Sequence, residues 1–353
     1  IHTLSELSKL PDVKLLVYAE RKEDPIRKEQ GWKECDWSLI DINLIPTSKY
    51  RFIIKTLKDK KNCINIFGGP FDSLIISFAL FLSIFMSIKS YVLTEPYIPI
   101  TSNLLKNKSK FRNWLSNKIR PLKYRMLWTF LKKRTHGVFA ISVTAIHQLI
   151  KFGVNPKKIL PFGYFIPRSK SLQGLPSLDN NISSINTLRI IFVGSLIHTK
   201  GIDIAIDTIT KINSSKVKVI LDVFGPYDKK NSYAWSSSIN YKGLIPFGEA
   251  QYKISKYDLL ILPSRYDGWG VVVNEALLAN VPVICSHQAG ASTLVKKWGC
   301  GICYDSLNEA ELKNHIEDIC SNKEVMLNNF RENLTFYGSF DGKVCQRKSI
   351  DFF

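Results

Sequence analysis

Two carboxylates flank a glycine-rich loop in the C-terminal half of the chain, and both could bind hydroxyl groups. Asp267 and Glu275 have seven residues between them, among them Gly268 and Gly270. A carboxylate accepts hydrogen bonds from hydroxyls, and the backbone N–H groups at the start of a helix favour an anion such as a diphosphate. This stretch therefore predicts a site for a ligand that carries hydroxyls and phosphates.

A second loop carries a lysine that could add a positive charge to such a site. The loop runs Gly194-Ser-Leu-Ile-His-Thr-Lys-Gly201, and Lys200 stands just before a predicted helix. A lysine together with free N–H groups suits a phosphate. For this loop taken alone, a simple strand-to-helix turn with a surface lysine is the alternative. The loop lacks the glycine spacing of a dinucleotide site.

Both loops follow apolar runs that are typical of buried parallel strands, residues 188–193 and 258–262. Each loop also precedes a segment with helical spacing, residues 202–212 and 271–278. Strands alternate with helices over most of the chain. This alternation predicts an α/β fold with parallel sheets and helices on both faces.

The length of the chain predicts two domains. A chain of 353 residues with 45% hydrophobic content is too long for one compact core. We expect the domains at residues 1–166 and 188–335, joined by a linker at 167–187 rich in Ser, Asn, Pro and Gly. A tail at 336–353 is expected to return towards the first domain. The chain begins at Ile1 with a helix rather than a strand, so we expect a fragment that lacks its first strand.

The formal charge of +19 is uneven along the chain. Residues 1–180 contain 30 Lys and Arg against 13 Asp and Glu, whereas residues 181–353 contain 19 against 17. A first domain with this excess should bind an anionic partner, either a membrane surface or a polyanion.

Much of the excess lies in residues 106–134, which hold eleven Lys and Arg and no acidic residue. Aromatic and leucine side chains alternate with these cations, as in an interfacial helix on anionic lipid. The alternative is a solvated basic face whose aromatic residues pack into the domain core. We do not expect nucleic-acid binding, because no recognised binding module frames the segment. The predicted membrane contacts are Arg112, Trp114, Lys118, Arg120, Lys123, Arg125, Trp128, Lys132, Lys133 and Arg134.

Other features argue against a membrane span and a metal site. The longest apolar run, residues 73–88, is short for crossing a bilayer, so we expect a buried helix. The N-terminus shows no secretory signal. The seven scattered cysteines suggest a reducing compartment. Cys300 and Cys303 have the spacing of a metal or redox pair, but no second pair follows, so we expect them to pack at the end of a strand.

These motifs resemble the retaining glycosyltransferases of family four, which have the GT-B fold. The resemblance is carried by Phe192-Val-Gly-Ser-Leu-Ile-His-Thr-Lys-Gly201, by Pro263-Ser-Arg-Tyr-Asp-Gly-Trp-Gly270 with Asn274-Glu-Ala276, and by Gly299-Cys-Gly301. It covers most of residues 137–320. The tryptophan-containing loop is most similar to bacterial enzymes that build O-antigen or capsule. The resemblance implies two Rossmann-like domains that face each other across a cleft.

The resemblance also assigns roles to residues of a nucleotide-sugar site. Lys200 would bind the diphosphate, near Gly194 and Ser195, and Glu275 would accept hydrogen bonds from the ribose hydroxyls. Asp267 would lie near the transferred sugar, where the family usually has Glu. Backbone groups of Gly268, Trp269, Gly270 and Val271 would meet the sugar and the diphosphate.

Two departures from the family pattern concern charged positions. Ser195 stands where many members have an arginine on the diphosphate. Glu95 stands where many members have a histidine at the end of a strand. Glu95 could contact the acceptor or the donor sugar, and simple solvation at the strand end is the alternative.

The expected activity is transfer of a sugar, with retention of configuration, from a UDP-sugar or GDP-sugar to a lipid-linked saccharide. No metal or other cofactor is expected. The enzyme would work in the cytoplasm, peripherally on the inner membrane. Two alternatives remain: a GT-B nucleotide-sugar epimerase, and a non-catalytic basic protein that binds a polyanion. The sequence leaves the base, the sugar, the linkage and the oligomeric state open.

Overall fold

The computed structural model describes residues 2–21, 40–69, 73–97, 110–172, 186–212, 217–227, 233–306 and 308–338, with the backbone alone at 110–118, 120 and 335–338. The described residues form two compact units. One contains those up to Tyr164, and the other contains those from Phe165 onward. The tail from residue 339 lies outside the described residues, so its expected return stays a prediction.

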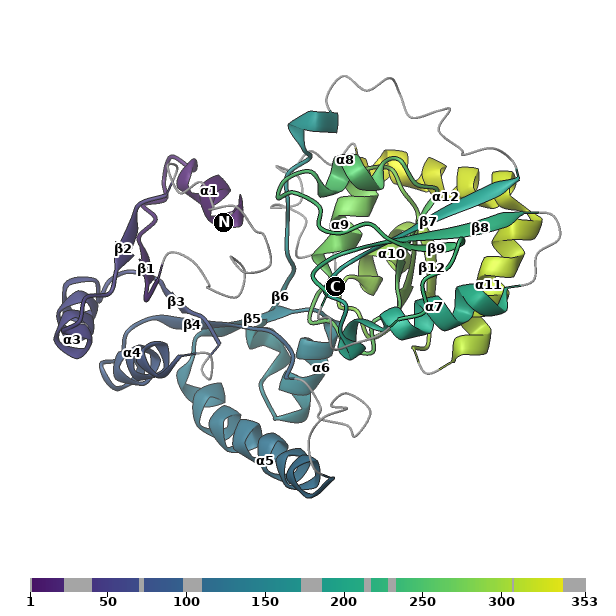
Figure 1. Ribbon diagram of the computed structural model, residues 1–353. Helices are drawn as coiled ribbons and strands as arrows, with labels where there is room; N and C mark the ends of the chain where they lie inside the picture. The colour runs from purple at the N-terminus through teal and green to yellow at the C-terminus, as the bar shows by residue number, and fades with distance from the viewer. Residues whose placement is uncertain are drawn as a thin grey trace. The chain divides into compact units, whose positions relative to one another are not determined.

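The first unit contains parallel strands in two sheets (Figure 1). Strands β1 Val17–Ala19 and β2 Ile42–Leu44 pair with each other. The larger sheet has the order β3-β4-β5-β6, with bounds Asn65–Phe67, Ser90–Thr94, Gly137–Ile141 and Ile159–Phe162. The helices are α1 His2–Ser8, α3 Lys49–Asp59, α4 Leu74–Phe85, α5 Lys110–Arg134 and α6 Val143–Lys151.

The predicted apolar helix of this unit is α4, but it is not buried along its length. The hydroxyl of Ser73 caps it by accepting hydrogen bonds from the N–H groups of Ile75 and Ile76. Ile75 and Leu80 are buried, whereas Leu74 and Phe85 are exposed. The expectation of a buried helix is therefore wrong at both ends. Among the described residues, no helix is long and apolar enough to cross a membrane.

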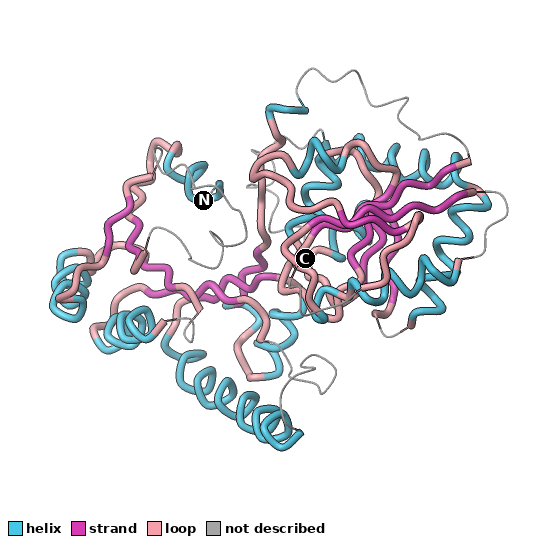
Figure 2. The backbone as a smooth tube through the Cα atoms, viewed as in Figure 1, coloured by secondary structure: helices cyan, strands magenta, loops and turns pink. Residues whose placement is uncertain are grey.

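The second unit is built on a parallel sheet with the order β12-β11-β10-β7-β8-β9, and helices cover both of its faces (Figure 1). The strands, which lie side by side in Figure 2, are β7 Thr187–Val193, β8 Lys218–Phe224, β9 Ile239–Tyr241, β10 Leu259–Leu262, β11 Val283–Ser286 and β12 Gly301–Tyr304. The helices are α7 Ile202–Lys211, α8 Ala250–Ile254, α9 Val271–Leu278, α10 Ser292–Trp298, α11 Glu309–Ser321 and α12 Lys323–Gly338.

The predicted linker is held by the second unit where the structure describes it. The amide side chain of Gln251 accepts a hydrogen bond from the Ser169 N–H at 2.7 Å and donates one to the Pro167 carbonyl at 2.8 Å. The short 3-10 helix Lys170–Leu172 follows. The start of the linker is therefore part of the second unit, and residues 173–185 lie outside the described residues.

Strand order places the two predicted ligand loops at one edge of this sheet. Strands β7 and β10 are neighbours, with Ile190 opposite Leu259 and Ile191 opposite Leu260. Because the strands are parallel, their carboxyl ends meet at the same edge. Gly201 lets the loops touch, since an added Cβ there would lie 1.9 Å from the Pro263 carbonyl oxygen.

Candidate functional site

The structure brings Lys200 and Asp267 together. The Lys200 Nζ lies 2.5 Å from the Asp267 Oδ2, and both side chains are mostly buried. Lys200 ends the short 3-10 helix His198–Lys200 after β7, and Asp267 lies in the loop after β10. Lys200 and Asp267, which the sequence predicts to be site residues, are 67 positions apart in the chain. The structure joins them in one ion pair at the carboxyl edge of the sheet.

Arg265 fastens the lysine loop to the loop after β10, and the sequence reasoning missed it. Its guanidinium donates to both carboxylate oxygens of Asp203, at 2.7 and 2.9 Å, and to the His198 carbonyl at 2.9 Å. Its backbone N–H donates to the Thr199 carbonyl at 2.9 Å. Lys200 is thus held next to a bidentate, charge-assisted contact.

The electrostatics of Asp203 agree with this contact. Burial raises the pKa of the Asp203 carboxyl, but the hydrogen bonds and charge of Arg265 outweigh burial and leave the pKa below its usual value. A cation just before the predicted Asp267 is the sequence signal that could have identified Arg265. The aspartate that it contacts could not be found from spacing.

Backbone hydrogen bonds fix the loop that contains Asp267. The Asp267 N–H donates to the Gln288 carbonyl at 3.1 Å, and the Asp267 carbonyl accepts from Gly290 at 3.1 Å. The Trp269 carbonyl accepts from the Ala291 N–H at 2.7 Å. The loop after β11 therefore holds the predicted ligand loop in place through backbone hydrogen bonds.

The side chain of Trp269 is structural. It is buried, and its Nε1–H donates to the Asn274 Oδ1 at 2.7 Å, which ties the loop to α9. The indole is therefore not free to contact a ligand. The predicted role of Trp269 is restricted to its backbone, as for Gly268 and Gly270.

The N-cap residue of helix α9 makes no side-chain hydrogen bond to the first backbone N–H groups of the helix. Gly270 is the N-cap with φ of +90°, a left-handed conformation that favours glycine, and Val271 beside it is exposed. Uncapped N–H groups at a helix start attract anions. The predicted cradle of backbone groups therefore starts next to Asp267.

Glu275 lies on α9 as a partly buried carboxylate. Within the part of the chain that the structure describes, no hydrogen bond or ion pair engages its side chain. Burial raises the pKa of Glu275 to about 7, because a charged carboxylate loses hydration there. A ligand with adjacent hydroxyls would supply the hydrogen bonds that this group lacks.

Gly194 and Ser195 open the lysine loop beside β8. The Gly194 N–H donates to the Phe224 carbonyl at 3.0 Å. The hydroxyl of Tyr233 donates to the Leu196 carbonyl at 3.1 Å, a contact that the sequence reasoning also missed. The loop is therefore anchored on both sides, by Tyr233 and by Arg265.

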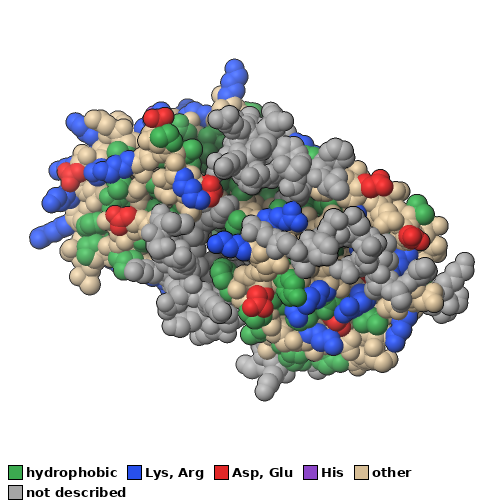
Figure 3. Space-filling view, turned by 90° about the horizontal axis from the view of Figure 1, so that it is seen from above, with side chains coloured by type: hydrophobic (Ala, Val, Ile, Leu, Met, Phe, Trp, Pro, Cys, Tyr) green, Lys and Arg blue, Asp and Glu red, His purple; other side chains and the backbone are tan. Residues whose placement is uncertain are grey.

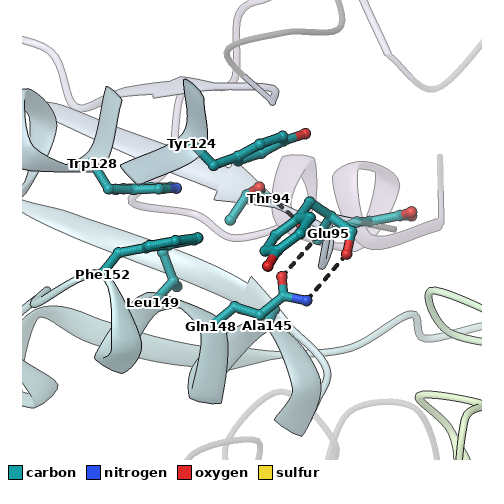
Figure 4. A pocket seen from close by; sticks show the side chains of 9 residues that line it. Thr94, Glu95, Tyr124, Trp128, Ala145, Gln148, Leu149 and Phe152 are labelled. Atoms are coloured by element: carbon teal, nitrogen blue, oxygen red, sulfur yellow. Dashed lines mark hydrogen bonds between the residues drawn. The ribbon is translucent and has the colours of Figure 1, made fainter. Parts of the chain in front are cut away.

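Glu95 belongs to the first unit, whereas the residues described so far belong to the second. It follows β4, is exposed, and accepts a hydrogen bond from the Tyr164 hydroxyl at 2.5 Å. Figure 4 shows it at a small pocket into which the rings of Tyr124 and Trp128 project. Gln148 also lines this pocket, and its side chain makes two hydrogen bonds with the backbone of Tyr97.

The predicted membrane contacts lie on α5, and one of them is wrong. Trp128 is only 2% exposed and packs in the core of the first unit, because its face of the helix points to the sheet. Lys123, Arg125, Lys133 and Arg134 are exposed, and Lys132 is partly buried.

The remaining predicted contacts, Arg112, Trp114, Lys118 and Arg120, have side chains outside the described part. Lys and Arg side chains are also spread over the face drawn in Figure 3. A basic surface alone therefore does not single out α5.

Cys300 and Cys303 pack in the second unit, as expected, whereas Cys63 in the first unit is exposed. Cys300 is buried, and Cys303 lies opposite Cys285 on neighbouring strands, with 3.7 Å between the sulfur atoms. Among the described residues, no group of three or more His, Cys, Asp or Glu side chains could hold a metal ion.

Sequence comparison relates the second unit to glycosyltransferases. Residues 181–336 match the family model "Glycosyl transferases group 1". An uncharacterized glycosyltransferase of Methanocaldococcus jannaschii is 30% identical over 38% of this chain and 39% of its own length. An uncharacterized 41.2 kDa protein in the cps region of Klebsiella pneumoniae is 24% identical over 70% of this chain and 67% of its own. The chain thus spans well under half of the first of these relatives.

Solved structures share this α/β fold. WaaG, a glycosyltransferase involved in lipopolysaccharide biosynthesis, superposes with a TM-score of 0.63 at 14% identity, covering 99% of this chain and 93% of WaaG. HepE of Anabaena in complex with UDP gives 0.64 at 15% identity, covering 94% and 90%. The predicted α/β GT-B fold is confirmed, and the part of the chain that matches the glycosyl transferases group 1 model, residues 181–336, holds the Lys200–Asp267 pair.

Proposed function

We propose that this protein is a retaining glycosyltransferase that uses a nucleoside-diphosphate sugar. The observation that carries the proposal is the Lys200–Asp267 ion pair at the carboxyl edge of the sheet, with the uncapped start of α9 beside it. A group 1 domain in residues 181–336 supports the reaction class. The complex of HepE with UDP supports a uridine nucleotide as one of the donors to test.

In the proposed complex each group of this site has one task. Lys200 and the first N–H groups of α9 bind the diphosphate and stabilise the charge that develops on it as it leaves. The Glu275 carboxylate accepts hydrogen bonds from the ribose hydroxyls. Asp267 binds a hydroxyl of the transferred sugar, and the backbone of Gly268 to Val271 lines the path between them.

The ion pair implies an exchange when the donor binds. Lys200 is already neutralised by Asp267, so the diphosphate must replace this carboxylate as the partner of the ammonium group. The replaced Asp267 is then free to accept from a sugar hydroxyl. Donor binding and positioning of the sugar are thereby coupled through one lysine.

The transfer itself is proposed to proceed on one face of the sugar. The bond between the anomeric carbon and the β-phosphate oxygen breaks, and its electron pair stays with the phosphate. The acceptor hydroxyl forms the new bond from the same face and gives its proton to the leaving phosphate. This route needs positioning and charge stabilisation from the protein but no protein nucleophile.

The acceptor is proposed to be a lipid-linked saccharide of a cell-surface polysaccharide, handled at the cytoplasmic face of the inner membrane. The basic helix α5 supports this acceptor class. The cps-region relative and the lipopolysaccharide role of WaaG support the same context. Glu95, exposed beside Tyr164, stays the predicted contact to the acceptor or the donor sugar.

The test is a transfer assay with the full chain, using UDP- and GDP-sugars and a polyprenyl-diphosphate-linked saccharide. We expect one sugar nucleotide to be consumed only when the acceptor is present, with the new linkage in the same anomeric configuration as the donor by NMR. Inversion would contradict the retaining mechanism. Conversion of the sugar nucleotide without an acceptor would support an epimerase instead.

A further inference from the structure

Helices α4 and α5 expose large apolar side chains next to one another. Leu74 on α4 is 89% exposed, and Leu122 and Met126 on α5 are 57% and 67% exposed. Isolated exposed apolar residues are ordinary, but these three line one groove, and such clusters mark interaction sites. The groove has a volume of about 460 Å³, within the range of binding pockets.

The groove lies between two helices that run side by side. Leu74 and Phe81 line it from α4, and Ile119, Leu122 and Met126 line it from α5. Further along both helices, Phe81 and Phe85 approach the ring of Phe130, with centroids 5.3 and 6.5 Å apart. Both helices lie on the same side of the four-stranded sheet (Figure 1). We call this the α4–α5 surface, defined by Leu74, Phe85, Ile119, Leu122 and Met126.

Charge decides which partner fits this surface. Helix α5 contains nine Lys and Arg and no acidic residue, and α4 contains no charged residue. Lys123 lines the groove, Arg125 on the same helix is exposed, and the Arg134 guanidinium lies 4.2 Å from the centre of the Phe130 ring. A partner must therefore offer hydrocarbon and negative charge within one side chain's length, as a bilayer with anionic lipids does.

We propose that the α4–α5 surface docks on an anionic bilayer. Leu74, Leu122 and Met126 enter the acyl region, and Lys123 and Arg125 contact the lipid phosphates. This surface differs from the one that the sequence predicts, because it includes α4 and leaves out the buried Trp128. The proposal deepens the proposed function by naming the surface that meets the membrane, and its test does not depend on sugar transfer.

Vesicle co-sedimentation of the full chain tests the proposal. The vesicles are phosphatidylcholine alone or an equimolar mixture with phosphatidylglycerol. Leu122→Gln/Met126→Gln removes two exposed apolar side chains and should weaken binding to the anionic vesicles by roughly tenfold or more. Lys123→Gln/Arg125→Gln should weaken it by roughly thirtyfold, given about 1 kcal/mol for each of the two cations near the surface.

Matched control variants distinguish binding through this surface from nonspecific vesicle binding by other apolar or basic residues. Ile54→Gln/Val325→Gln removes exposed apolar side chains elsewhere, and Lys55→Gln/Lys58→Gln removes the same charge from α3. Both controls should sediment as the wild type does. Equal losses in the controls, or no loss in the two α4–α5 variants, would overturn the proposal.

Two further readouts keep the outcome decisive. A thermal melt reports whether each variant is folded, and if the apolar variant unfolds, the charge variant alone decides, because Lys123 and Arg125 are exposed. Nucleoside-diphosphate binding, followed by calorimetry, should be unchanged in every variant. A protein that binds vesicles as expected but no nucleotide would leave this surface standing and overturn the proposed function.

Discussion

At the scale of single residues, Glu275 couples the candidate site to pH. Its pKa of about 7 belongs to the free protein, and the carboxylate is the form that accepts hydrogen bonds from two hydroxyls. As pH falls below this value the group takes up a proton that donor binding must release. Calorimetry should therefore show nucleoside-diphosphate affinity falling by up to about tenfold per pH unit below the pKa. Glu275→Gln should bind weakly at every pH, and a wild-type-like pH profile in this variant would assign the titration to another group.

The raised pKa of Glu275 also affects the stability of the folded protein. A carboxyl group whose pKa is raised by folding stabilises the native state only while it is protonated, so this contribution is lost as pH rises from about 4.5 to about 7. Glu275→Gln should therefore melt at a higher temperature than the wild type above pH 7. The gain should be on the order of 2 kcal/mol. An unchanged melting temperature would mean that the buried charge is solvated.

Lys200 and Asp267 should respond in opposite ways to neutral substitutions. Lys200→Met removes the cation for the diphosphate and should weaken nucleoside-diphosphate binding by at least about tenfold. Asp267→Asn removes the competing partner of Lys200, so affinity for the nucleotide should stay the same or rise while sugar transfer falls. Calorimetry and transfer assays on the two variants check this. A parallel loss of nucleotide affinity in Asp267→Asn would show that the carboxylate supports Lys200 and does not compete for it.

At the scale of elements, Arg265 and Asp203 hold the lysine loop against the loop after β10. Arg265→Lys cannot restore two parallel hydrogen bonds to one carboxylate. We expect it to raise the donor KM several-fold with a smaller change in kcat.

Asp203→Asn should lower stability by about 1–3 kcal/mol near neutral pH. Because the pKa of Asp203 is lowered, this difference should disappear as pH falls through that pKa in acid. A loss of stability that persists in acid would assign it to packing.

The contact between the two loops can be tested at Gly201. An alanine there has φ of +70° and a Cβ that meets the Pro263 carbonyl oxygen. Gly243 has a similar φ of +82° with nothing within 4 Å of the added Cβ, so Gly243→Ala measures the backbone strain alone. Gly243→Ala should cost about 1 kcal/mol, and Gly201→Ala clearly more, with weaker nucleotide binding. Equal costs in thermal unfolding would show that the loops can separate.

Sequence reasoning located the elements well, because the apolar runs of β7 and β10 are local signals. It also selected Lys200, Asp267 and Glu275 from spacing and resemblance. It failed where a tertiary neighbour decides the direction of a side chain. The same polypeptide pattern lets Trp128 face lipid or core, and the neighbouring sheet buries it. Arg265 contacts Asp203 only because β7 and β10 are adjacent in the sheet, and no local sequence pattern specifies that adjacency.

At the scale of the whole molecule, charge and chemistry are divided between the two units. The first carries the basic helix α5 and the α4–α5 surface, and the second carries the Lys200–Asp267 pair and the residues that match the glycosyl transferases group 1 model. Such a division suits an enzyme that takes a soluble donor and an acceptor at a membrane. If both proposals hold, mutations should remove membrane binding and nucleotide binding separately.

The most direct test of the central claim is nucleotide binding by the full chain, measured as thermal shift and calorimetry with UDP and GDP. The account predicts that one of the two stabilises the wild type, by about 2.7 kcal/mol at a hundred times its Kd. Lys200→Met should lose this stabilisation, while Lys123→Gln/Arg125→Gln should keep it. Stabilisation by neither nucleotide, or stabilisation that Lys200→Met retains, would contradict a donor site at the Lys200–Asp267 pair.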